Sequence, residues 1–133
     1  MSLFSVFGIS GSGMDAYQTW LDAIGGNVAN VNDSGPTSQP AYQSRSLIVS
    51  EAGTGQVGDG VKVTGVTLGS AQGELAWEPG NPQADVNGMV RHPVVDLPGQ
   101  MVQMVMAERD YQANVSVITQ ARQAYESALG LGT

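Results

Sequence analysis

Apolar residues recur at helical spacing near the N-terminal end of the chain. Within SGSGMDAYQTWLDAIGGNVANVND, the intervals alternate between three and four residues at Met14, Tyr17, Leu21, Ile24, Val28 and Val31. This alternation is typical of one continuous helical stripe of the coiled-coil type. Ser12 is a plausible N-cap for the helix, after a mildly apolar segment at residues 1–10. Gly25 and Gly26 weaken the helix but also permit close approach of a second helix.

A second helical stripe fills the C-terminal end. Its members follow the same alternating interval: Met104, Ala107, Tyr111, Asn114, Ile118, Ala121, Tyr125 and Ala128. Asp96 is a good N-cap, Pro98 is tolerated in a first turn, and the final GLG ends the helix. Asn114 is the polar member of the stripe. It is either an exposed position or a buried amide that fixes the register of packed helices.

Between the stripes, the period changes to that of short strands and turns. Residues 32–40 are rich in Asn, Gly, Ser and Pro, which predicts a loop. AYQSRSLIV has β character, GTGQVGDG predicts a turn, VKVTGVTL alternates as a strand does, and GELAW predicts a further short strand. The segment EPGNPQADVNGMVRHP, with three prolines and two glycines, is expected to be irregular.

These patterns predict a mainly α fold with a small β-rich middle. The middle is too small to cover both stripes, so the two long terminal helices are expected to pack on each other, antiparallel, as a coiled-coil-like pair. Short strands or a hairpin lie between them in the sequence. We expect residues 1–32 and 94–133 to form one helical core domain, and residues 33–93 to form a loop and β-rich region.

Charge is scarce for a chain of this kind. Only 13% of the 133 residues are charged, against about 25% in ordinary soluble domains. Residues 97–131 carry only Glu108, Arg109, Asp110, Arg122 and Glu126. Neutral polar and apolar side chains therefore dominate the last helix, and such a surface suits contact with other protein. The net charge of −7 and the single lysine argue against nucleic acid and anionic membrane surfaces as partners.

Candidate chemistry is sparse. The chain has no cysteine and only one histidine, His92, which is expected to be a loop residue without a role, and so no multi-histidine or thiolate metal site is expected. GISGSG lacks the flanking features of a phosphate loop. The segment from Asp85 to Gly88 resembles the start of a calcium loop, but the further acidic ligands are missing, so a turn is expected. Glu108 and Asp110 do not share a helix face. We expect no enzyme activity and no cofactor.

The sequence also carries no apolar run of membrane-spanning length and no ordinary secretory signal. If the protein leaves the cytoplasm, it does so by a route that needs no cleaved signal peptide. Two functions fit the observations so far: a structural subunit that polymerises through its helices, and a cytoplasmic helical-hairpin adaptor or binding module.

Specific motifs favour the first of these functions. PGNPQAD, the NG-x-V turn, QMVQM and R-x-YQAN follow one another in EPGNPQADVNGMVRHPVVDLPGQMVQMVMAERDYQANVSVI. This segment closely resembles the C-terminal signature of the FlgC family of flagellar basal-body rod proteins. The early NVANVND is similar to the N-x-AN motif that rod, hook and hook-associated proteins share. Together the motifs span almost the whole chain.

The resemblance implies a structural subunit of the proximal rod, an axial drive shaft that transmits motor torque toward hook and filament. It implies export through the flagellar type III apparatus, helical stacking with copies of itself and with other rod proteins, and a place in the periplasmic part of the basal body. The motif positions are Asn27, Ala29, Asn30, Pro79, Asn81, Pro82, Ala84, Asp85, Gly88, Met101, Arg109, Tyr111, Gln112, Ala113 and Asn114. The predicted subunit-packing set draws on these positions and on the two stripes. Its members are Met14, Tyr17, Leu21, Ile24, Asn27, Val28, Ala29, Asn30, Val31, Pro79, Asn81, Pro82, Asp85, Gly88, Met104, Arg109, Tyr111, Gln112, Asn114, Ile118 and Tyr125.

Three positions depart from the family pattern. Asp33 stands where threonine is common, and Met89 replaces a common aromatic residue. Pro98-Gly99-Gln100 stands where the family has a smoother, acidic start to its last helix. The resemblance therefore leaves the first residue of this helix open.

Overall fold

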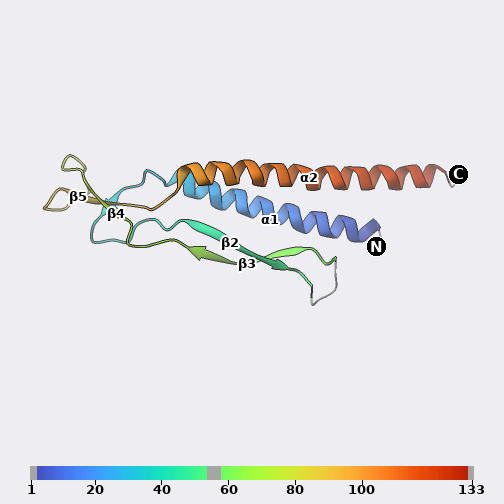
Figure 1. The fold of residues 1–133 in the computed structure, drawn as a ribbon, viewed down its shortest axis with the longest axis horizontal. Coiled ribbons are helices and arrows are strands. Elements are labelled where there is room, and N and C mark those ends of the chain that lie inside the picture. Colours follow the sequence, from blue (N-terminus) through green and yellow to red (C-terminus); the bar gives the residue numbers. More distant parts are fainter. Residues whose placement is uncertain (1–2, 54–57, 132–133) are drawn as a thin grey trace. The chain divides into compact units, whose positions relative to one another are not determined.

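The computed structural model of the chain describes residues 3–53 and 58–131 (Figure 1). Its elements are α1 (Leu3–Ala29), β1 (Gly35–Pro36), β2 (Arg45–Glu51), β3 (Val61–Leu68), β4 (Glu74–Trp77), β5 (Met89–His92) and α2 (Leu97–Gly130). Two long terminal helices are in contact, and small antiparallel sheets lie between them in the sequence. The predicted fold class is confirmed.

The chain divides into two compact units, and each unit contains part of both helices. The first unit comprises Met1–Leu21, Ile48–Gly65 and Val105–Thr133, and the second comprises Asp22–Leu47 and Val66–Met104. This division follows the density of contacts along the chain. The helical core domain expected from the sequence is defined by element type instead, and it stays a prediction.

Contacts within each unit give the relative direction of the helices. In the first unit, Gly13 lies against the Asn114 side chain, and four residues farther along α1 the Tyr17 side chain hydrogen-bonds to Asp110. A step forward along α1 is thus a step back along α2. In the second unit, Asn27 Nδ2 donates to Gln100 Oε1 at 2.9 Å. The predicted antiparallel packing follows from these pairs.

Helix α1 begins at Leu3, so the predicted N-cap at Ser12 is wrong. Ser12 lies inside the helix, where its hydroxyl donates to the Ile9 carbonyl at 2.8 Å. Three small residues, Ser10, Gly13 and Ala16, are buried one turn apart. Burial of this row stabilises a glycine-rich segment whose intrinsic helix propensity is low, as tertiary contacts commonly do.

The predicted role of the glycine pair is also wrong. A Cβ on Gly25 would meet nothing within 4 Å, and one on Gly26 would meet the Tyr42 hydroxyl at 3.4 Å. The close approach between helices occurs at Gly13 instead, where a Cβ would lie 3.2 Å from Asn114. The helix ends at Ala29, so Val31 at the end of the predicted stripe lies beyond it.

Helix α2 begins where the sequence predicted. The Asp96 carboxylate accepts a hydrogen bond from the Gly99 amide at 3.2 Å, and the Asp96 carbonyl accepts one from the Gln100 amide at 2.9 Å. This is N-cap geometry, with Pro98 in the first turn. The stripe lies on the covered side as far as Ala121, with Ala107 fully buried. Tyr125, near the end of the stripe, is 46% exposed.

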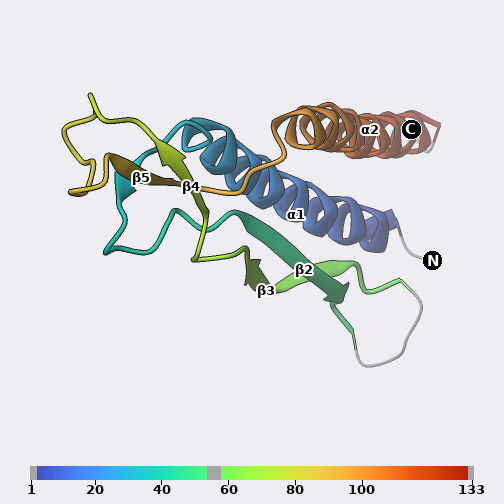
Figure 2. The same ribbon diagram turned by 60° about the vertical axis from the view of Figure 1, so that its left-hand side comes forward.

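The strands form two small sheets. β2 and β3 make a two-stranded sheet, and Figure 2 shows the second sheet, in which β5 lies between β1 and β4. β5 pairs antiparallel with both neighbours, with Gly35 opposite Arg91 and Glu74 opposite His92. Val90, in the centre of β5, has no exposed surface.

The strand predictions were partly correct. VKVTGVTL is confirmed as β3 and GELAW as β4, whereas β2 begins only at Arg45, so the first four residues of AYQSRSLIV are not strand. The segment at residues 78–93, expected to be irregular, contains the central strand β5. A two-residue strand, β1, lies inside the predicted 32–40 loop. Of the predicted GTGQVGDG turn, residues 54–57 lie outside the described part of the chain.

Candidate subunit-packing surface

Asn27, the first residue of the N-x-AN motif, is 1% exposed and uses all its hydrogen-bonding capacity. Its amide nitrogen donates to the Arg45 carbonyl and to Gln100 Oε1, both at 2.9 Å. Its oxygen accepts from the Arg45 amide at 2.8 Å and from the Tyr42 hydroxyl at 3.1 Å. One side chain thus joins α1 to the start of β2 and to the first turns of α2.

The other residues of this motif lie nearer the surface. Asn30 Nδ2 donates to the Gly26 carbonyl at 2.7 Å, a local bond that closes the last turn of α1. Val28 and Val31 are half-buried, and Ala29 is exposed. Of the predicted motif positions on α1, Asn27 is therefore the one whose described hydrogen bonds reach a distant segment.

The NG turn is organised by Asp85. Its Oδ1 accepts from the Asn87 amide at 2.8 Å and the Met89 amide at 3.0 Å, and its Oδ2 accepts from the Thr37 hydroxyl at 3.0 Å. The backbone bonds from Met89 and Asn87, and then the bond from Thr37, lower the pKa of the Asp85 carboxyl. The turn expected at Asp85–Gly88 is confirmed.

Gly88 completes this turn. Its φ of +76° is in the region that favours glycine, and a Cβ there would lie 3.2 Å from Pro79 Cβ and from Trp77 Nε1. Conformation and space both require glycine, so the sequence motif has a direct structural cause. Pro82 is exposed and Ala84 is half-buried in the same loop.

Asn81, Glu78 and His92 form a connected polar network. Asn81 Nδ2 lies 2.9 Å from Glu78 Oε2 and 3.1 Å from Ser34 Oγ, and His92 Nε2 lies 2.9 Å from Glu78 Oε1. The bonds from Asn81 and then His92 lower the pKa of Glu78. His92 is therefore a strand residue with two hydrogen-bond partners, and its prediction as a loop residue without a role was wrong.

In the first unit, α1 and α2 approach each other closely, and part of their contact is polar. Tyr17 hydrogen-bonds to the Asp110 carboxylate, and its ring stacks on Trp20 with centroids 6.1 Å apart. Burial, and then the negative charge and hydrogen bond of Asp110, raise the pKa of Tyr17. Asn114 is half-buried against Gly13, and its Nδ2 donates to the Asp110 carbonyl at 3.0 Å.

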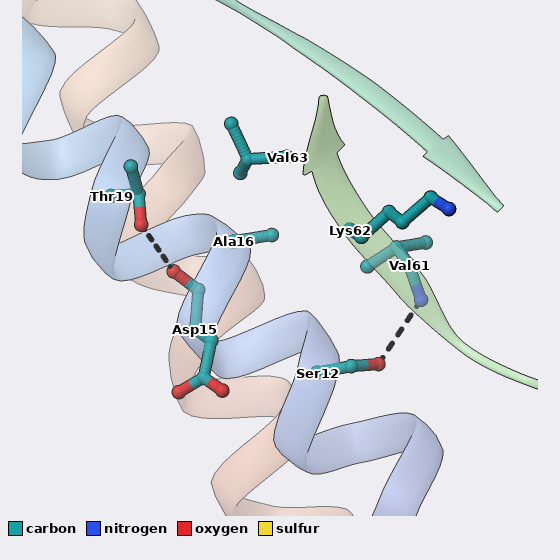
Figure 3. A pocket seen from close by; sticks show the side chains of 7 residues that line it. All are labelled: Ser12, Asp15, Ala16, Thr19, Val61, Lys62 and Val63. Atoms are coloured by element: carbon teal, nitrogen blue, oxygen red, sulfur yellow. Dashed lines mark hydrogen bonds between the residues drawn. The ribbon is translucent and has the colours of Figure 1, made fainter. Parts of the chain in front are cut away.

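A groove in the same unit runs between α1 and β3 (Figure 3). It has a volume of about 280 Å³ and is lined by Ser12, Asp15, Ala16, Thr19, Val61, Lys62 and Val63. The Ser12 hydroxyl accepts from the Val61 amide at 3.1 Å and thereby ties the strand to the helix. The groove carries no cluster of reactive side chains, and its described polar contacts are structural.

Helix α2 exposes much apolar surface. Met101, Val102, Val105, Met106, Val115, Val117 and Leu129 are each more than two-fifths exposed. Arg109 and Gln112 are also exposed, whereas Met104, Tyr111 and Ile118 are half-buried. The salt bridge between Arg122 and Glu126, at 2.8 Å, links residues one turn apart. Single exposed apolar residues are ordinary, and the notable feature here is that seven of them occur along one helix.

Among the described residues, no group of three or more His, Cys, Asp or Glu side chains is placed to hold a metal ion. In the same part of the chain, neither helix is both long and apolar enough to cross a membrane. The described polar groups instead join one segment of the chain to another.

Known proteins match the chain along its whole length. It is 38% identical over 133 residues to the flagellar basal-body rod protein FlgC of Salmonella typhimurium, with 99% of each chain covered. The chain belongs to the FlgC family of flagellar basal-body rod proteins. Identity to the FlgC protein of Escherichia coli is also 38% over 133 residues, and to that of Bacillus subtilis it is 28% over 149 residues. A family described as flagellar basal body rod FlgEFG protein C-terminal matches residues 86–131.

Membership of the FlgC family makes the chain a structural rod subunit rather than an enzyme. It also decides between the two functions that the sequence left open, against the adaptor. The resemblance read from PGNPQAD, QMVQM and R-x-YQAN is confirmed. Four of the predicted motif residues, Asn27, Asn81, Asp85 and Gly88, stabilise the fold of the subunit itself.

Several structural residues were not predicted. Tyr42 and Gln100 complete the Asn27 network. The Asp110 carboxylate accepts a hydrogen bond from Tyr17, and the Ser12 hydroxyl accepts one from the first amide of β3. The row of small residues at Ser10, Gly13 and Ala16 was a signal in the sequence for close packing along α1. The other contacts join residues far apart in the chain, and no local pattern could have indicated them.

Proposed function

We propose that the chain is a subunit of the proximal rod that stacks helically with copies of itself and with neighbouring rod proteins. In this proposal, the terminal helices α1 and α2 line the inner layer of the tube. The rod then acts as a drive shaft that carries motor torque toward hook and filament. The family supports assembly with other rod proteins, and the proposal adds the surface by which this chain does so.

The single observation that carries the proposal is the exposed apolar series along α2. Met101 is 49% exposed, Met106 is 52% exposed and Val115 is 41% exposed. Burying such side chains against a neighbouring subunit gains about 25 cal/mol per Å² of apolar area. The same helix carries few charges that would need to be desolvated on contact. Both properties favour helix-to-helix contact within a polymer.

We further propose that the subunit reaches the periplasmic part of the basal body through the flagellar type III export apparatus. Membership of a family of flagellar basal-body rod proteins supports this destination. Export of this chain in cells that lack the flagellar type III apparatus tests this part. Its appearance in the periplasm of such cells would show that another route is used.

Met106→Lys tests the packing surface. The side chain is half exposed in the subunit, so the free energy of unfolding should change by only about 0.5 kcal/mol. In an assembled rod, the new charge would be buried without a partner, which costs several kcal/mol. We expect a folded, exported subunit that is missing from purified basal bodies, in cells that make no other copy of it.

Gln103→Lys is the matched control, because it introduces the same charge on the same helix at an exposed polar position. We expect it to incorporate and to support swimming better than Met106→Lys. Equal incorporation of the two variants at wild-type level would show that this face of α2 does not contact a neighbour.

A further inference from the structure

His92 lies between a backbone carbonyl oxygen and a carboxyl oxygen. Its Nδ1 is 2.9 Å from the Asp33 carbonyl oxygen, and its Nε2 is 2.9 Å from Glu78 Oε1. Asp33 belongs to the link between α1 and β1, while Glu78 follows directly after β4. The imidazole therefore bridges two segments that adjoin the two neighbours of β5 in the sheet, β1 and β4.

The network continues beyond Glu78 and closes on itself. Glu78 Oε2 accepts from Asn81, whose amide nitrogen also lies 3.1 Å from Ser34 Oγ. Ser34 is the neighbour of Asp33, so the link after α1 is held at two successive residues. The Glu78 carboxylate joins the two side chains that make these contacts, because it bonds to both His92 and Asn81.

The two bonds of His92 require a definite number of protons. A neutral imidazole carries one N–H and can donate to only one of the two oxygens. Both bonds form when the imidazole is doubly protonated beside a carboxylate, or when a neutral imidazole faces a protonated Glu78. In either form, the pair holds one proton more than a neutral imidazole and a carboxylate together.

We propose that His92 and Glu78 form a pH-sensitive clasp, which holds the Asp33–Ser34 link while the pair carries this additional proton and releases one hold when the proton leaves. Histidine is the side chain that ordinarily changes charge between about pH 5 and 8. The side chains are 26% exposed for His92 and 40% exposed for Glu78, so the proton exchanges directly with water. The clasp thus loosens when the pair loses its additional proton to the solvent.

Other charged groups surround the imidazole. Glu74 lies opposite His92 in the β4–β5 ladder. Arg91, the neighbour in β5, directs its guanidinium to the carbonyls of Gln72 and Thr37. Asp33 is exposed and contacts the ring through its backbone carbonyl. Of these groups, only Glu78 bonds to the ring through a carboxylate.

A fall in pH also weakens the clasp, through protonation of the Glu78 carboxylate. Hydrogen bonds from Asn81 and His92 lower the pKa of Glu78 in the folded chain. A group with a depressed folded pKa contributes stability above its unfolded value, about 4.3 for Glu, and this stability is lost as the pH falls through the folded pKa.

NMR of the full chain tests the clasp, because the single histidine gives imidazole signals that belong to one residue. The ¹⁵N shifts of the two ring nitrogens report whether one or both carry protons. Exchange of the Asp33 amide, which donates to the Asn30 carbonyl at 3.1 Å, reports how firmly the link is held. We expect loss of the second ring proton to accompany roughly tenfold faster exchange, after correction for the intrinsic effect of pH.

Glu78→Gln distinguishes the clasp from a general effect of nearby negative charge on the imidazole. The introduced amide can donate to a bare Nε2 while Nδ1–H donates to Asp33, so a neutral ring makes both bonds. We expect the pH dependence of Asp33 exchange to disappear in Glu78→Gln and to persist in the matched control Glu74→Gln. Persistence in Glu78→Gln would overturn the proposal. If that variant does not fold, the wild-type chain still decides: deprotonation of His92 without a change in Asp33 exchange overturns it.

Discussion

Removal of the Asn27 side chain should cost more stability than removal of any comparable amide on α1. Asn27→Ala leaves four groups without their partner, of which the amide and carbonyl of Arg45 belong to the backbone and cannot turn away. An unpaired buried polar group costs about 1–3 kcal/mol, while alanine regains up to about 0.7 kcal/mol of helix propensity. Tyr42 and Gln100 are half-buried and can turn to water. We therefore expect a net loss of about 2–4 kcal/mol.

Urea unfolding followed by circular dichroism measures this loss from the midpoint and slope of the transition. Asn30→Ala is the matched control, because it removes an amide directly after the same helix, where the side chain bonds only locally, to Gly26. We expect the control to lose no more than about 1 kcal/mol. If Asn27→Ala and Asn30→Ala are equally stable, the Asn27 network does not stabilise the fold.

Asn27→Asp sharpens the same test with pH. The carboxylate keeps both acceptor roles but loses the donations to Arg45 and Gln100, and it buries a charge. Burial of a carboxyl raises its folded pKa above the unfolded value of about 3.9. The variant should therefore be least stable at neutral pH, and its stability relative to the wild type should recover as the pH falls through the raised pKa.

Three further predictions concern other parts of the fold. Gly25→Ala should stabilise the chain by about 1 kcal/mol in thermal or urea unfolding, since nothing lies within 4 Å of the new methyl group. Gly13→Leu should destabilise the chain in the same assay, because the larger side chain collides with Asn114. In Asp85→Asn, the free energy of unfolding should fall less steeply as the pH is lowered, because the wild-type carboxyl, with its lowered folded pKa, contributes stability that is lost in acid. Acid unfolding curves that are the same in the variant and the wild type would contradict this. Tyr111→Ala should cost about 2 kcal/mol at its half-buried position and reduce the subunit content of basal bodies, whereas Asn114→Leu should yield subunits that associate in the wrong register.

The sequence predicted elements well where a local pattern and a local cap coincide. Helix α2 is the best case, because Asp96 and Pro98 begin it and a regular stripe follows. Helix α1 was placed too late, because Gly8, Gly11 and Gly13 reduce local propensity and the benefit of a small residue at Gly13 appears only beside Asn114. Strand β5 was missed, because four residues between turns acquire strand geometry from pairing on both sides.

The candidate site was predictable in its members but not in its connections. The motif identified Asn27, Asn81 and Asp85 as important positions, and all three make several hydrogen bonds. Each of the three also has a partner far away in the chain, at Arg45, Ser34 and Thr37, which periodicity could not reveal. His92 was misjudged for the same reason, since its role depends on Glu78 and the Asp33 carbonyl rather than on its neighbours in the chain.

The bond between Asn27 and Gln100 has a consequence for the order in which the chain folds. It joins residues 73 positions apart, whereas the β4–β5 ladder closes between nearby residues. Closing a longer loop costs more conformational entropy, so the ladder should form early and the pairing of the helices late. On the ribosome, α1 emerges first, and Asn27 lacks its partner on α2 until Gln100 has been made. The helical pair is therefore completed only after synthesis has passed the whole middle region, and a chain truncated before Leu97 has no means to complete it.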